Sequence, residues 1–79
     1  MADITLERFK LFAITCVEDK LKRQRKAIKP WGRAEYICYI TGLIDSYVFA
    51  NGRRLDVDTR KLLRVDIMVE SGVMAEVLI

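Results

Sequence analysis

Apolar residues recur every three or four positions through the first third of the chain, which is the period of an amphipathic α-helix. The pattern predicts a helix from Leu6 to Ala27 or Ile28, capped at its start by Thr5. Ile4, just before the cap, is placed to pack on Phe9 as a hydrophobic staple. The predicted buried stripe consists of Phe9, Phe12, Ala13, Cys16, Val17 and Leu21.

The run Lys29-Pro30-Trp31-Gly32 interrupts this pattern, and Pro30 disfavours helical geometry at the residue before it. We expect the boundary between two helices here, a single kinked helix being the alternative. From about Arg33 to Ala50 the period resumes in a mostly apolar segment, which predicts the central helix. Gly42 inside it indicates close packing against a neighbour. Apolar residues follow two adjacent lines along this helix. The first line consists of Tyr36, Ile40, Leu43 and Tyr47. The second consists of Ile37, Ile40, Ile44 and Val48.

The dipeptide Asn51-Gly52 supports two interpretations. Glycine readily adopts the left-handed backbone that ends many helices, so Gly52 can close the central helix. The same dipeptide between residues 47–50 and 53–57 also resembles the turn of a short β-hairpin. The helical period continues unbroken through Val48, which favours the helix.

A third helix is predicted by the residues that follow. Asp58 is placed to cap it, with Val57 packing on Leu62 as a staple, and Gly72 is placed to end it. Six of residues 73–79 are apolar, the last position included, which is typical of a segment docked on a core. The sequence therefore predicts a compact, mainly α-helical domain of three helices with a docked C-terminal segment.

Composition limits the class of protein further. The chain has 79 residues, of which 52% are hydrophobic, and a net charge of +3. This length allows one domain, residues 1–79, and the apolar content argues against intrinsic disorder. Chains this small bury a modest share of their surface, so stability is marginal or depends on a partner.

The chemistry-bearing residues are few. Cys16 and Cys38 lie in apolar runs and are expected to behave as small core residues in a reducing compartment. Asp3 stands where a secretion signal carries basic residues, so we expect a cytoplasmic protein. Asp45, in the most apolar segment, is expected on a solvated strip. With no His, phosphate loop, metal cluster or triad in the sequence, we expect no enzyme, cofactor or metal.

Charge is distributed unevenly along the chain. Residues 1–33 contain nine bases and four acids (+5), whereas residues 34–79 contain five bases and seven acids (−2). Such asymmetry favours a surface that attracts an acidic protein or nucleic acid. On a continued first helix, Lys22, Arg25, Lys26 and Lys29 would share one face. The predicted binding residues are Lys22, Arg23, Arg25, Lys26, Lys29 and Arg33, with Trp31 as a stacking or anchoring residue.

Alternatives to a binding role remain open for these bases. A basic run near a helix C-terminus also complements the helix dipole and keeps an apolar chain soluble. A helix-turn-helix reader matches the sequence weakly, because Gly42 is followed by apolar rather than polar residues. A second, smaller basic group consists of Arg53, Arg54, Arg60, Lys61 and Arg64.

Some apolar residues lie outside the stripe that a single helix would bury against the core. Leu11 and Ile14 lie beside the stripe of the first helix, and Leu78 and Ile79 end the chain. Surplus apolar surface of this kind usually marks an interface. We therefore expect a homodimer that uses these four residues.

As a whole, the chain resembles the small accessory proteins of phages and other mobile elements, including anti-CRISPR proteins. The resemblance lies in its compactness, the lack of catalytic residues and the charge-biased segment from Lys20 to Arg33. It implies a non-enzymatic inhibitor in the cytoplasm of a bacterial host, bound to a protein complex that handles nucleic acid. The alternative is a small regulator that contacts DNA phosphates directly.

Overall fold

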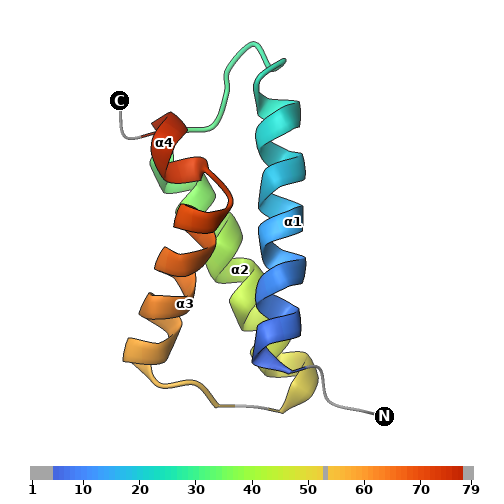
Figure 1. The fold of residues 1–79 in the computed structure, drawn as a ribbon, viewed down its shortest axis with the longest axis vertical. Helices are drawn as coiled ribbons and strands as arrows, with labels where there is room; N and C mark the ends of the chain where they lie inside the picture. Colours follow the sequence, from blue (N-terminus) through green and yellow to red (C-terminus); the bar gives the residue numbers. More distant parts are fainter. Residues whose placement is uncertain (1–4, 53, 78–79) are drawn as a thin grey trace.

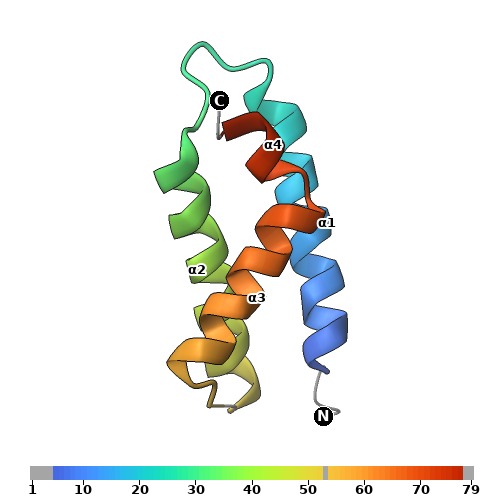
Figure 2. The same cartoon turned by 60° about the vertical axis from the view of Figure 1, so that its left-hand side comes forward.

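The computed structural model describes residues 5–52 and 54–77. Three main helices, α1 (Leu6–Gln24), α2 (Arg33–Asn51) and α3 (Val57–Glu70), run alternately up and down the bundle, and the short α4 (Val73–Val77) follows (Figure 1). Figure 2 shows α4 at the same end of the bundle as the connection between α1 and α2. The prediction of a helical domain with a docked C-terminal segment is confirmed. The described residues include no strand, so the hairpin interpretation is wrong.

Helix α1 begins as expected and ends early. The Thr5 hydroxyl accepts a hydrogen bond from the Arg8 amide at 3.2 Å, which caps the first turn. The helix ends at Gln24 rather than at residue 27 or 28. Beyond Leu21 no side chain of the stripe reaches the core, and Ile28 is fully exposed, so packing holds no further turn. The Ile4 staple lies outside the described residues.

The buried stripe of α1 is narrower than the sequence suggests. Phe12 is largely exposed and Cys16 is half-buried, so both lie at the edge of the stripe. Its buried members are Phe9, Ala13, Val17 and Leu21. Because their spacing is four, four and four, they form a single line that faces α2 and α3.

Helix α2 supplies the centre of the bundle. Its first turn is held by the Glu35 carboxylate, which accepts a hydrogen bond from the Gly32 amide at 3.0 Å. It ends at Gly52, whose φ of 61° lies in the left-handed region. Gly42 is exposed with open space beside it, so the expected close packing is wrong. Cys38 is exposed as well, contrary to its predicted core position.

Helix α3 starts at Val57, two residues earlier than predicted, so Asp58 lies inside the helix and the cap predicted there is wrong. Asp56 precedes it, and Val57 and Leu62 are exposed, so the staple between them is wrong. Leu55 instead packs against the core, and its carbonyl accepts a hydrogen bond from the Arg60 Nε at 3.3 Å. Gly72, with a φ of 88°, turns the chain after α3 so that the buried Val73 docks α4.

The core lies where all four helices meet. Phe9 of α1 stacks on Tyr47 of α2 with ring centroids 4.4 Å apart, and Ile40 and Ile67 are fully buried. Burying one large apolar side chain stabilises a fold by roughly 1.5–3 kcal/mol. Within residues 5–52 and 54–76, the twelve buried apolar residues are Phe9, Ala13, Val17, Leu21, Tyr36, Ile40, Ile44, Tyr47, Leu63, Ile67, Met68 and Val73.

Candidate interaction surface

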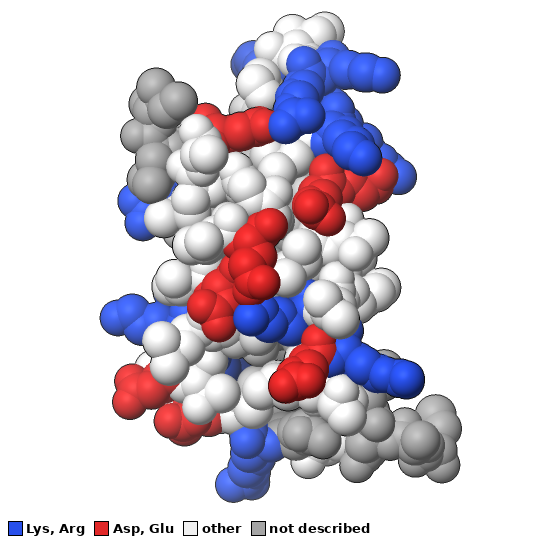
Figure 3. Space-filling model, viewed as in Figure 1, with Lys and Arg blue, Asp and Glu red and all other residues white. Residues whose placement is uncertain are grey.

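The predicted binding bases lie together at one end of the bundle. Figure 3 shows Lys and Arg side chains gathered where α1 passes into α2, whereas bases and acids alternate over the rest of that face. Four of the bases line a shallow hollow of about 370 Å³ at this end. We call the following six exposed residues the basic end: Lys22, Arg23, Arg25, Lys26, Lys29 and Arg33.

The basic end is not one helical face. Because α1 ends at Gln24, Lys26 and Lys29 lie on the connection between the helices, and Arg33 opens α2. The sequence-based placement of four bases on one face of a continued helix is therefore wrong. The turn of the connection, rather than helical spacing, brings them to the same end.

Two of the six bases are held by acids. The Arg23 Nη2 lies 3.1 Å from the Asp19 Oδ2, one helical turn earlier. Arg25 forms an ion pair with Glu76 of α4, and its hydrogen bond to that carboxylate raises the pKa of Arg25. The tie fixes the connection to α4. The other four bases have no acidic partner among the described residues: Lys22, Lys26, Lys29 and Arg33.

Trp31 anchors the connection. Its amide donates a hydrogen bond to the Gln24 Oε1 at 2.9 Å, which joins the end of α1 to the start of α2. Its ring meets Tyr36 and Tyr39 edge-on at 5.4 and 5.5 Å, and the Lys20 Nζ lies 4.8 Å from its centroid. Because these three side chains already contact the Trp31 ring, Trp31 is better suited to anchor the connection than to stack on a ligand.

Ile28 is a residue that the sequence analysis missed. It is 100% exposed on the connection, between Lys26 and Lys29 in the sequence. The sequence did carry a signal, since Ile28 is a single large apolar residue inside a basic run. We placed that residue at the end of the first helix. An apolar centre within a charged rim is the usual anatomy of a protein interface.

A mainly apolar hollow of about 520 Å³ adjoins the basic end through Trp31. It carries the exposed thiol of Cys38, whereas the half-buried Cys16 has a pKa raised by burial and by the charge of Asp19. The residues that line the hollow are Trp31, Ala34, Glu35, Cys38 and Tyr39. The basic end thus has an open apolar neighbour that a partner can contact.

The residues predicted for a dimer interface differ in exposure. Leu11 is 65% exposed, whereas Ile14 packs partly against the core. Leu78 and Ile79 lie outside the described residues. On α3, the exposed side chains of Leu62, Val65 and Val69 fall on one helical face and add apolar surface.

The described part of the chain contains neither a metal-ligand cluster nor a membrane-spanning helix. It holds no group of three or more His, Cys, Asp or Glu residues arranged to take a metal ion. None of its helices has the length and apolarity that crossing a membrane requires. Comparison with protein-family models, with curated proteins and with solved structures found no match.

Proposed function

We propose that the protein is a non-enzymatic interaction protein, an inhibitor of the anti-CRISPR kind that binds a host complex handling nucleic acid. One observation carries the proposal: four bases that have no acidic partner among the described residues lie at the same end of the bundle as the fully exposed Ile28. Unpaired cations attract an acidic surface and speed association. The proposal places the protein in the cytoplasm of a bacterial host.

The apolar parts of this surface favour a protein partner over bare nucleic acid. Ile28 and the hollow beside Trp31 offer apolar contact area, which a protein surface can cover. Trp31, the aromatic residue of this end, is engaged by Lys20 and two tyrosines rather than open to a base. The alternative, direct binding of DNA phosphates, is favoured only by the four unpaired bases.

We also propose that the chain forms a homodimer. The support is the apolar surface that Leu11 on α1 and the Leu62, Val65 and Val69 face of α3 leave exposed. Light scattering at tens of micromolar measures the mass directly. A dimer mass that falls to the monomer value in Leu62→Glu is the expected result, and a monomer mass for the unaltered chain would reject the proposal.

The binding proposal is tested with two matched charge reversals. The variant Lys26→Glu with Lys29→Glu alters the basic end, and the control Arg8→Glu with Arg54→Glu makes the same charge change at exposed sites elsewhere. Each immobilised protein is incubated with bacterial lysate, and retained proteins are identified by mass spectrometry. We expect a nucleic-acid-handling complex on the unaltered chain and on the control, and its loss from the first variant. Equal retention by both variants would contradict the proposal.

A salt titration with a short DNA duplex separates the two candidates. Contacts to four phosphates predict that log K falls with log salt at a slope of about −3.6. A protein-binding inhibitor is expected to show no measurable DNA affinity at about 150 mM salt. Tight, salt-sensitive DNA binding at that concentration would favour the alternative function.

A further inference from the structure

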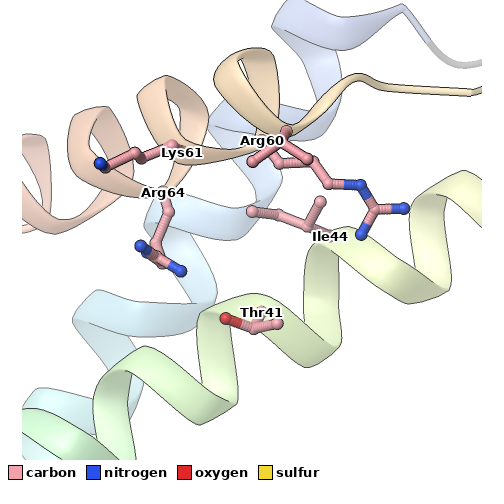
Figure 4. A pocket seen from close by; sticks show the side chains of 6 residues that line it. Thr41, Ile44, Arg60, Lys61 and Arg64 are labelled. Carbon is pink, nitrogen blue, oxygen red and sulfur yellow. The ribbon is translucent and has the colours of Figure 1, made fainter.

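A third hollow lies between α2 and α3, toward the other end of the bundle. Its volume is about 350 Å³, within the range of sites that hold small ligands. Helix α2 contributes a hydroxyl and an apolar floor, and α3 contributes three cations (Figure 4). The lining residues of this groove are Thr41, Ile44, Val57, Arg60, Lys61 and Arg64.

The three cations of the groove are unequal. Arg60 forms an ion pair with Asp45 of α2, and its Nε also donates to the Leu55 carbonyl, so its guanidinium is fixed. The Asp45 side chain is 56% exposed, as expected from the sequence. Lys61 and Arg64 have no acidic partner in the described part of the chain. The groove therefore keeps two uncompensated positive charges.

Arg64 is the cation best placed to meet a ligand in the groove. It is half-buried, and in Figure 4 its guanidinium projects from α3 toward α2, above Thr41. A guanidinium carries five N–H donors. None of those on Arg64 has an acceptor within the described residues, and its nitrogen atoms stay open to solvent. These donors are therefore available to an anion that enters the groove.

We propose that the groove binds a dianionic phosphate group, free or as the monoester of a small molecule. The Arg64 guanidinium takes two phosphate oxygens in a bidentate contact, and Lys61 and the Thr41 hydroxyl donate to the remaining oxygen atoms. A phosphate monoester carries a charge near −2 at neutral pH, which matches the two free cations. A phosphodiester, as in nucleic acid, carries a single negative charge and leaves one cation without a partner. In a monoester, the organic part lies against Val57, which is exposed at the side of the groove.

The proposal is independent of the basic end and is tested by titration followed in ¹⁵N–¹H NMR spectra. The probes are inorganic phosphate, phenyl phosphate and dimethyl phosphate. We expect saturable shifts that centre on Thr41, Lys61 and Arg64, with dimethyl phosphate at least about tenfold weaker. Tighter binding of phenyl phosphate than of inorganic phosphate identifies a monoester as the ligand, and equal affinities identify free phosphate. Shifts spread over all basic residues, or no saturation below about 10 mM, would overturn the proposal.

Variants test the groove residue by residue. Arg64→Gln removes the charge at similar length and is expected to weaken phosphate binding at least about tenfold. Arg64→Lys is expected to keep part of the phosphate affinity, because lysine retains the positive charge but lacks the paired N–H donors of the guanidinium. The matched control Arg54→Gln removes an exposed charge outside the groove and is expected to leave the affinity unchanged. Should Arg64→Gln fail to fold, Thr41→Val deletes the hydroxyl alone and is expected to weaken binding severalfold. Equal affinities across the altered and control proteins would reject the site.

Discussion

The basic end and the α2–α3 groove use basic side chains in the same way on surfaces of different shape. In each, one arginine is tied by a carboxylate to a neighbouring helix, Arg25 to Glu76 and Arg60 to Asp45. In each, other bases remain without acidic partners in the described residues. The basic end projects around Ile28, whereas the groove is recessed over Ile44.

Under the two proposals, the shape of the surface rather than its charge separates the two classes of ligand. A projecting surface with an exposed apolar residue offers contact area to a macromolecule and does not enclose a small molecule. A groove with two unpaired cations offers charge and hydrogen-bond donors to a single compact anion. In both regions the tied arginine joins two helices, and the bases without acidic partners carry the proposed binding.

The largest effect on stability is expected in the core, because both regions are built on the same packed helices. Ile40 of α2 is fully buried and lies beside Thr41 of the groove. Ile40→Ala is expected to lower the free energy of unfolding by about 2–5 kcal/mol, measured by urea denaturation. The control Phe49→Ala removes a side chain that is 91% exposed and should change the free energy by less than about 0.5 kcal/mol. A similar loss in both variants would contradict the assigned core.

A smaller effect, on partner binding, tests whether the hollow beside Trp31 belongs to the interaction surface of the basic end. Cys38 is exposed in the hollow beside Trp31, whereas Cys16 is half-buried with a raised pKa. Iodoacetamide at neutral pH is expected to modify Cys38 at least about tenfold faster than Cys16, followed by mass spectrometry. Modification at Cys38 alone should weaken partner binding and leave phosphate binding unchanged. Unimpaired partner binding would exclude the hollow from the interaction surface.

The smallest effect concerns the tie between Arg25 and Glu76. Both side chains are partly exposed and water weakens their attraction, so Glu76→Gln is expected to shift the midpoint of urea denaturation only slightly. It also frees Arg25, which should steepen the salt dependence of any binding by the basic end by about one unit of slope. Glu18→Gln makes the same charge change at an exposed residue of α1 and serves as the control. An identical salt dependence in the two variants would show that Arg25 takes no part in binding.

The helices could be predicted from the sequence because their signals are local. The apolar period, the Thr5 cap and the glycines at 52 and 72 each act within a turn or two. The end of α1 could not be predicted, because the apolar pattern continues to Ile28 in the sequence whereas the last buried residue of α1 is Leu21. A local pattern does not show where the neighbouring helices end.

The candidate sites were predictable only in part, for the same reason. The basic run marked the basic end, but the exposure of Ile28 and the tie from Arg25 to Glu76 depend on how the connection turns. The groove joins Thr41 to Arg64 across two helices, and no spacing in the sequence relates them. In the sequence, Arg60 and Arg64 stand out only as members of the second basic group. The carboxylate of Asp45 and the hydroxyl of Thr41 reach them from another helix, which the sequence does not indicate.

The connection between α1 and α2 has a consequence for proteolysis. It is held at Arg25 and Trp31, and the basic residues between these anchors are exposed. A protease that cleaves after lysine or arginine is expected to cut at this end first, after Lys26, since Pro30 protects the bond after Lys29. Such a cut divides the interaction surface and spares the buried residues on either side of it. A single cleavage would thus end binding while leaving the helices packed.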